Sequence, residues 1–260
     1  MSKKIQSTLL NATLTHYVPS LFFGVVTLYI LSKAFPQTFL SELNDNSLNS
    51  VDLLFSGLNG LVVAAAVVIF HQRRNAYLRK THAALRTLAD RATFFHSAVV
   101  GFFAGTSGVL LGAYNEGIIA LTVLVLAILI WHLRTFIHYI PIMLKPGNIA
   151  TWGDVSRLLT TYFNMLAGFT LLNATLEGIH LMAKITPPFA FSADNGDIFL
   201  NSLYYTVVTM TTLGFGDFVP QTWDGKLLLI FQCLVSYFMF ALVIGIITRG
   251  VVRVQDKTNL

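Results

Sequence analysis

The amino-acid sequence predicts an all-α membrane protein with six transmembrane helices and one shorter helix that enters the membrane without crossing it. Composition gives the first indication, because 55% of the 260 residues are hydrophobic and only 11% are charged. A soluble domain carries about a quarter charged residues. The second indication is the length of the apolar stretches, which matches the thickness of a bilayer.

A helix needs about 20 apolar residues to cross about 30 Å of hydrocarbon. Six stretches meet this requirement, and they lie near 17–35, 51–70, 93–113, 117–140, 158–183 and 226–250. A seventh apolar segment, at about 198–211, is too short to span. We therefore expect it to be a re-entrant helix.

The distribution of basic residues predicts the orientation of these helices. With the N-terminus in the cytoplasm, 14 of the 17 lysine and arginine residues lie on the inner side, and Lys33, Lys184 and Lys226 lie outside. Cytoplasmic loops carry an excess of lysine and arginine, so we predict a multi-pass integral protein of the plasma membrane with cytoplasmic N- and C-termini. The net charge of +5 follows from this topology, and we expect no nucleic-acid partner.

We expect four parts along the chain. Residues 1–140 form a four-helix transmembrane domain, and 141–157 form an interfacial linker where proline and glycine residues interrupt a continuous helix. Residues 158–253 form a second domain, in which two spanning helices flank the short apolar segment. Residues 254–260 form a short cytoplasmic tail.

The residue pattern does not predict an enzyme or a bound cofactor. The sequence contains no nucleophile–base pair, no histidine spacing typical of a metal site and no phosphate-binding loop. Cys233 is the only cysteine, which excludes an intrachain disulfide and a thiolate metal site.

The most informative stretch is 206–220, Thr-Val-Val-Thr-Met-Thr-Thr-Leu-Gly-Phe-Gly-Asp-Phe-Val-Pro. Such a run can stand extended with its backbone carbonyls turned toward one axis, where they replace the water shell of an ion. Glycine at 214 and 216 allows the backbone conformations required, which residues with a side chain adopt poorly. We expect the Thr212 hydroxyl at the inner end of this column, Asp217 at the outer mouth, and a change of chain direction at Pro220.

This stretch resembles the selectivity filter of potassium channels, and residues 158–253 are similar to the pore of the voltage-gated family. The resemblance implies a filter formed by Thr212, Leu213, Gly214, Phe215 and Gly216, which we call the predicted filter. It also implies that K+, the permeant ion, binds the backbone carbonyls of Thr212, Leu213, Gly214 and Phe215.

One such segment supplies only a quarter of a carbonyl ring, so we expect a homotetramer. We therefore predict a potassium-selective channel that conducts K+ passively. A non-selective cation channel is the nearer alternative, and a potassium transporter subunit is the more distant one.

Several neighbouring residues are expected to support the predicted filter. Thr211 ends the short apolar helix, whose C-terminal end brings partial negative charge toward the ion. Tyr204 and Tyr205 either brace the filter from behind or serve ordinary packing. Phe215 replaces the tyrosine most common in the family, so one hydrogen bond that would hold the filter open is missing. In related channels an acid near Glu177 hydrogen-bonds the backbone behind the filter; alternatively, Glu177 lies in water beyond its span.

The last apolar stretch is expected to line an inner cavity. Ser236 occupies the position where many relatives carry a hinge glycine, and Gly245 is a second candidate for the bending point. Four residues fall on one helical face and are our candidates for the cavity wall: Tyr237, Ala241, Ile244 and Thr248. The alternative is that this face packs against a neighbouring helix.

The first four stretches do not resemble a working voltage sensor. The fourth stretch contains only Arg134, and we expect no acid at all in the second and third stretches, where acids would pair with sensor charges. Moving one charge through 100 mV yields about 2.3 kcal/mol, so several charges per subunit are needed for steep gating. We therefore expect weak or absent voltage dependence.

A basic loop follows the second stretch. We expect its lysine and arginine residues to anchor the topology. The functional alternative is that anionic lipid headgroups bind Arg73, Arg74, Arg79 and Lys80.

Overall fold

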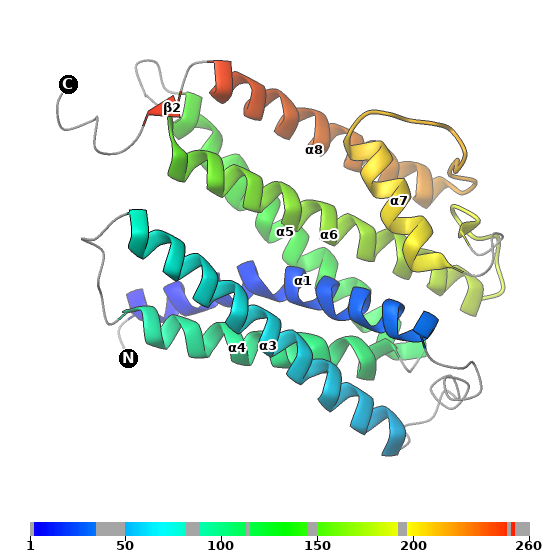
Figure 1. Ribbon diagram of the computed structural model, residues 1–260. Helices are drawn as coiled ribbons and strands as arrows, with labels where there is room; N and C mark the ends of the chain where they lie inside the picture. Colours follow the sequence, from blue (N-terminus) through cyan, green and yellow to red (C-terminus); the bar gives the residue numbers. More distant parts are fainter. Residues whose placement is uncertain are drawn as a thin grey trace. The chain divides into compact units, whose positions relative to one another are not determined.

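The computed structural model describes residues 3–34, 50–81, 89–112, 115–144, 150–191, 197–248 and 251–252. These residues form long α-helices and one pair of two-residue strands (Figure 1). The chain divides into two compact units, residues 1–121 and 122–260. The division falls within a helix, before the boundary that we expected at 140.

The first unit contains α1 (Lys3–Ala34), α3 (Ser50–Thr81), α4 (Ala89–Gly112) and the beginning of α5 (Asn115–Leu144). Glycines allow α3 and α4 to pack closely. A Cβ at Gly60 would clash with Thr106 Oγ1 and would lie 2.9 Å from the Phe102 carbonyl oxygen, and one at Gly105 would lie 2.9 Å from Val63 Cγ2. Asn59 Nδ2 also donates a hydrogen bond of 3.0 Å to the Gly105 carbonyl, which joins the two helices.

The first unit also corrects one expectation about its charges. We expected no acid within the second and third spans, but Asp52 lies in the first turn of α3 and is only 1% exposed. Ser56 and Asn59, one and two turns further along the same helix, are buried too. This end of α3 therefore presents a polar face to the interior of its unit.

The second unit contains the rest of α5, α6 (Trp152–Met182), α7 (Ile198–Met210) and α8 (Trp223–Thr248). Strands β1 (Ala150–Thr151) and β2 (Val251–Val252) pair in parallel, with Ala150 opposite Val251. The pairing joins the start of α6 to the end of α8. The short helix α7 packs against both α6 and α8 (Figure 1).

The expected linker is partly helical. α5 continues through Pro141 and ends at Leu144, and α6 already begins at Trp152. Residues 145–149 of the linker and the predicted tail at 254–260 lie outside the described residues.

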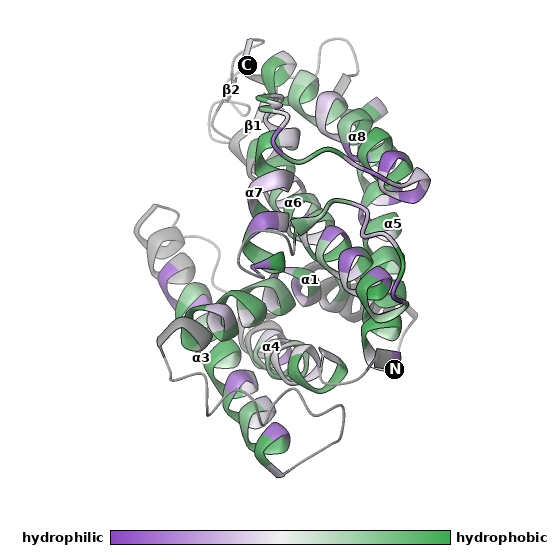
Figure 2. Ribbon diagram, turned by 90° about the vertical axis from the view of Figure 1, so that its right-hand side faces the viewer, coloured by the Kyte–Doolittle hydropathy of each residue, from purple (hydrophilic) through white to green (hydrophobic). Residues whose placement is uncertain are grey.

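Hydrophobic residues dominate the helices (Figure 2). Five described segments are long and apolar enough to cross a membrane: Thr13–Leu31, Ser50–Arg73, Phe95–Gly112, Glu116–His138 and Trp223–Ile246. They correspond to five of the six predicted spans. The short apolar helix that we predicted at 198–211 is α7, which has 13 residues.

The remaining predicted span, 158–183, forms α6, which is long enough but is not among these apolar segments. Its polar content lowers its hydropathy. Six polar side chains of this helix are buried within the protein: Asn164, Thr170, Asn173, Thr175, Glu177 and His180. These six polar side chains therefore point into the protein rather than toward its surroundings.

Candidate functional site

The predicted filter begins where α7 ends, and the two are joined by hydrogen bonds. The Thr212 amide donates to the Thr209 carbonyl at 3.1 Å, and the Leu213 amide donates to the Val208 carbonyl at 3.0 Å. The Gly214 amide reaches the same Val208 oxygen at 3.4 Å. These bonds occupy carbonyls that would otherwise lack a partner at the C-terminal end of a helix.

This arrangement fixes the direction of the carbonyl groups. In a trans peptide, the C=O of one residue and the N–H of the next point in opposite directions. The amides of residues 212, 213 and 214 point back to α7, so the carbonyls of Thr211, Thr212 and Leu213 point away from it. Successive backbone oxygens therefore face the same side of the segment.

The backbone dihedrals follow an alternating pattern. Thr212, Gly214 and Gly216 have φ values of +61°, +54° and +78°, whereas Leu213 and Phe215 have negative φ. Alternation between left-handed and right-handed conformations turns every second peptide plane over, which keeps the carbonyls on one side. The positive φ expected at the two glycines is confirmed.

Thr212 was not predicted to share this conformation. A positive φ is uncommon for a residue with a side chain and unusual for a β-branched one. Its only sequence signal is the spacing, since residue 212 lies two positions before Gly214 just as Gly216 lies two after it.

All residues from 211 to 217 are exposed in the single chain. Leu213 is 61% and Phe215 is 66% exposed, and a Cβ at Gly214 or Gly216 would meet no atom within 4 Å. Within the described part of this chain, the face that carries the carbonyls is uncovered.

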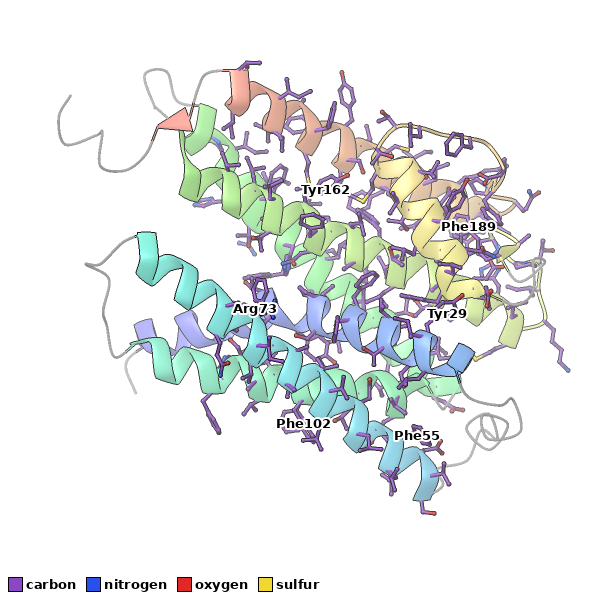
Figure 3. The ribbon with its side chains drawn as sticks, in the orientation of Figure 1. Tyr29, Phe55, Arg73, Phe102, Tyr162 and Phe189 are labelled. Atoms are coloured by element: carbon purple, nitrogen blue, oxygen red, sulfur yellow. The ribbon has the colours of Figure 1, made fainter. Side chains whose placement is uncertain are left out.

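An aromatic cluster contains Phe189, Phe191 and Tyr205. Phe189 is labelled in Figure 3. Phe189 and Phe191 stack with a centroid distance of 4.9 Å, and the Tyr205 ring lies 5.1 Å from that of Phe189. Phe218, just after the predicted filter, packs edge-on against Phe191 at 5.2 Å. Tyr205 belongs to α7, Phe189 and Phe191 precede this helix, and Phe218 follows it. The cluster therefore connects α7 to the chain before it and to the chain after the predicted filter.

Tyr204 lies on the exposed side of α7 and interacts with Asp217. This interaction with the tyrosine hydroxyl is the main cause that lowers the pKa of Asp217. The Phe218 amide also donates to Asp217 Oδ1 at 3.1 Å. Asp217 therefore places a negative charge at the end of the predicted filter at neutral pH.

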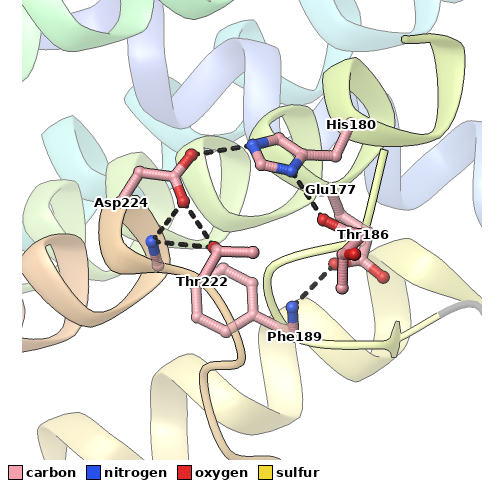
Figure 4. A network of polar contacts seen from close by, with 7 residues as sticks. Glu177, His180, Thr186, Phe189, Thr222 and Asp224 are labelled. Atoms are coloured by element: carbon pink, nitrogen blue, oxygen red, sulfur yellow. Dashed lines mark hydrogen bonds and ion pairs between the residues drawn. The ribbon is translucent and has the colours of Figure 1, made fainter. Parts of the chain in front are cut away.

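Glu177 is fully buried on α6, so the alternative that it lies in water is wrong. Its Oε2 accepts a hydrogen bond of 3.0 Å from the Phe189 amide (Figure 4). The carboxylate thus binds the backbone of the segment before α7, where the aromatic cluster begins. Its contact with the predicted filter is indirect, through that cluster.

A second buried polar contact joins three helices and was not singled out from the sequence. Asn173 on α6 donates through Nδ2 to Thr206 Oγ1 at 3.0 Å and to Gln232 Oε1 at 3.2 Å. Thr206 belongs to α7 and Gln232 to α8, and all three side chains are fully buried. The only sequence signal for this contact was the presence of polar residues inside apolar stretches.

The predicted cavity face of α8 is exposed in the single chain. Tyr237, Ala241, Ile244 and Thr248 are all exposed, so this face packs against no other helix in the described part of the chain. The same spacing of three and four residues continues toward the N-terminus of α8 through Trp223, Leu227, Ile230 and Leu234, which are also exposed.

The two hinge candidates differ in their surroundings. Ser236 is buried away from this face, and its hydroxyl donates to the Gln232 carbonyl at 2.6 Å. A Cβ at Gly245 would meet no atom within 4 Å. α8 is one unbroken helix from Trp223 to Thr248, and a hinge in it stays a prediction.

Of the residues proposed to bind lipid headgroups, the structure describes the side chain of one. Arg73 is exposed near the end of the second membrane-capable segment, while the side chains of Arg74, Arg79 and Lys80 lie outside the described ones. Lipid binding here stays a prediction. The described residues hold no group of three or more His, Cys, Asp or Glu side chains that could bind a metal ion.

Comparison with known proteins supports this reading of the second unit. Residues 180–253 match the family model Ion_trans_2, described as an ion channel. Potassium voltage-gated channel subfamily KQT member 3 of Rattus norvegicus is 32% identical over 106 residues, which cover 39% of this chain and 12% of the relative. Subfamily KQT member 1 is 42% identical over 60 residues, which cover 23% of this chain and 10% of the Felis catus protein or 9% of the Xenopus laevis protein.

The chain therefore spans about a tenth of the length of the curated relatives that it matches. No solved structure matches it. The matched segment contains α7, the predicted filter and α8, so the similarity to an ion channel family and to potassium voltage-gated channels lies in this part of the chain.

Proposed function

We propose that this chain is one subunit of a homotetrameric, potassium-selective channel that conducts K+ passively. The observation that carries the proposal is the alternating sign of φ along residues 212–216, together with the carbonyls of Thr211, Thr212 and Leu213, which are turned away from α7. In this function the carbonyl oxygens of Thr212, Leu213, Gly214 and Phe215 replace the hydration shell of the ion.

The position of α7 supports the same function. Its last carbonyls face the start of the predicted filter, and the C-terminal end of a helix carries about half a negative charge. Four such ends around one axis stabilise a cation at the inner end of the filter. Asp217 adds a further negative charge at the other end of the segment.

The exposed surfaces of the single chain support a tetramer. The predicted filter and one complete face of α8 lie uncovered in the single chain. Their side chains are largely apolar, so we expect other subunits to cover part of this surface. Four copies arranged around an axis bring the four carbonyl columns together and place the α8 faces along one central cavity.

We also propose that α6 spans the membrane as the fifth transmembrane helix in chain order, which brings the number of spans to six. A polar side chain within a bilayer is tolerated where it is buried in protein and has a partner. Glu177 and Asn173 meet both conditions. Their burial explains how a helix of modest hydropathy can occupy this position.

Weak or absent voltage dependence is part of the proposal. The only basic residue of the membrane-capable segment Glu116–His138 is Arg134. One charge moving through 100 mV yields about 2.3 kcal/mol, which is too little for steep gating.

Purified protein in planar bilayers tests the function directly. With equal concentrations of K+ on one side and Na+ on the other, we expect a reversal potential far from zero, with the sign of a pore that passes K+ and excludes Na+. A reversal potential near zero would favour a non-selective cation channel, and flux that stops without a coupled second ion would favour a transporter. The mass of the detergent-solubilised complex gives an independent check, and a monomer would contradict the proposal.

A further inference from the structure

A cluster of polar side chains connects the end of α6, the segment that follows it and the start of α8 (Figure 4). His180, near the end of α6, is only 8% exposed. Its Nε2 lies 2.7 Å from Asp224 Oδ2, and its Nδ1 lies 2.8 Å from the Thr186 carbonyl oxygen. Asp224 belongs to the first turn of α8, so the imidazole connects that helix to α6 and to the segment after it.

The two partners of the imidazole fix its proton content. A carbonyl oxygen only accepts hydrogen bonds, so Nδ1 must carry a proton to bond Thr186. A neutral imidazole then has no second proton on Nε2, which would leave a bare lone pair facing a carboxylate oxygen. The short contact to Asp224 therefore requires one additional proton between the two side chains.

The surroundings of Asp224 place that proton on the histidine. Asp224 Oδ1 accepts hydrogen bonds from the Thr222 hydroxyl and, at 2.9 Å, from the Gly225 amide. A carboxylate with donors on one oxygen is stabilised in its ionised form. When the imidazole is protonated, both of its N–H groups donate, one to the Thr186 carbonyl and one to the Asp224 carboxylate.

The pair holds the chain that leaves the predicted filter. Thr222 and Gly225 bind Asp224, and the neighbouring Gln221 amide donates to the Pro188 carbonyl at 2.7 Å. The chain between Asp217 and α8 is therefore fixed at its far end by contacts with α6 and the segment after it.

Other charged groups on these elements are arranged differently. Glu177 lies one turn before His180 on α6, and its Oε2 accepts from the Phe189 amide. Lys184 and Lys226 are exposed, and Asp197 is half-buried at the start of α7. Asp224 is accordingly the carboxylate in direct contact with the imidazole.

The geometry points to His180 and Asp224 as positioning residues for the outer mouth, acting as a proton-dependent clamp on the chain that leaves the predicted filter. This inference rests on the proposed function. When external pH rises and the imidazolium loses its proton, one of its two hydrogen bonds is lost. The segment 217–225 is then held less firmly, and the conducting state becomes less persistent.

Single-channel recording with pH varied only on the outer side, from about 5 to about 9, tests the clamp. In the native channel we expect the duration of conducting bursts to fall several-fold toward high pH, with an unchanged reversal potential. The variant His180→Gln has no titrating group and should give a flat profile. His138→Gln is the control, because His138 is exposed on α5 and its loss should leave the native profile intact.

Asp224→Asn gives the sharpest test, because it should reverse the profile. The asparagine Oδ1 can accept from Thr222 and Gly225 while its amide donates to the lone pair of a neutral imidazole. Protonation of His180 then breaks this contact, so bursts should shorten toward low pH. A residue with a purely structural role would not reverse the sign of the pH dependence.

Failure of the clamp and failure of channel function give different results. K+ currents with a flat native profile, or a native profile retained in His180→Gln, would overturn the clamp alone. If the native protein passes no current, the proposed function fails. Thermal unfolding of the purified protein then tests whether the contact between His180 and Asp224 depends on the proton. The native melting temperature should then exceed that of His180→Gln at low pH and lose this advantage as pH rises; a constant difference would overturn it.

Discussion

Replacing Gly214 by alanine isolates the contribution of backbone conformation to ion selectivity. Gly214 has a φ of +54°, and a Cβ placed there would meet no atom within 4 Å of the single chain. The substitution therefore introduces no clash within the subunit. Its cost is conformational, about 1–2 kcal/mol for a residue with a side chain in the left-handed region.

This cost acts four times in a tetramer, so it amounts to about 4–8 kcal/mol, which is comparable with the whole stability of an average protein. The backbone can relieve it by moving residue 214 to negative φ, which turns one carbonyl out of the column. Since about 1.4 kcal/mol corresponds to a factor of ten, the relaxed conformer gains roughly tenfold in each subunit. We expect the Gly214→Ala variant to lose potassium selectivity or to fail to assemble.

The assay compares reversal potentials in mixed K+ and Na+ with the mass of the detergent-solubilised complex. Gly57→Ala is the matched control, because a Cβ at Gly57 also meets no atom within 4 Å but the residue lies within α3. Alanine in a helix is favoured over glycine by about 1 kcal/mol, so this control should assemble and conduct normally. Native potassium selectivity in Gly214→Ala would refute the assignment of the carbonyl column.

Three further substitutions test the surroundings of the predicted filter. Glu177→Ala leaves the buried Phe189 amide without its acceptor, and we expect a loss of about 1–3 kcal/mol in thermal unfolding; an unchanged melting temperature would contradict this role. Asn173→Leu removes both bonds of the three-helix contact, and a similar loss is expected by the same measurement, whereas a gain in stability would show that the contact is dispensable. Asp217→Asn should lower K+ conductance at low ionic strength, with the difference shrinking as salt screens the charge. Because the pKa of Asp217 is lowered from 3.8, its charge is present above that value and is lost only as pH falls below it, so native conductance should hold down to about pH 4.

Local sequence determines the features of this molecule that proved predictable. The five apolar helices follow from stretches whose length matches a bilayer. The left-handed backbone at residues 214 and 216 follows from glycine, which adopts positive φ without steric cost. In both cases the physical cause lies within the residues themselves.

Features that depend on packing between distant segments were not predictable. Asn173 and Gln232 are separated by 59 positions, and His180 and Asp224 by 44. Their contacts exist only because α6 and α8 pack together at one particular register. α5 continues through Pro141 for a different, local reason. A proline near the end of a long helix removes one hydrogen bond, and the rest of the helix remains intact.

The distribution of polar and apolar surface in the second unit has a single explanation. Glu177, Asn173 and Gln232 are fully buried, while large apolar side chains from Trp223 to Ile244 are exposed along one face of α8. This arrangement would be unstable in water, where exposed apolar area is costly. At 1.5 Å per residue, the 26 residues of α8 extend about 39 Å, which exceeds the thickness of the hydrocarbon core.

The exposed face therefore runs the full depth of a bilayer and begins beside the chain that leaves the predicted filter. Lipid alone can cover the apolar face of a membrane helix such as α8. The carbonyl side of residues 212–216 cannot lie against lipid, because each unsatisfied backbone oxygen costs several kcal/mol there. In the proposed tetramer, ions and water meet the carbonyls, and the α8 faces surround the same passage, where neighbouring subunits cover part of their apolar surface. If Leu234→Cys and Tyr237→Cys in the assembled protein reacted no faster with a water-soluble thiol reagent than with a lipid-soluble one, the α8 face would lie in lipid and this arrangement would be excluded.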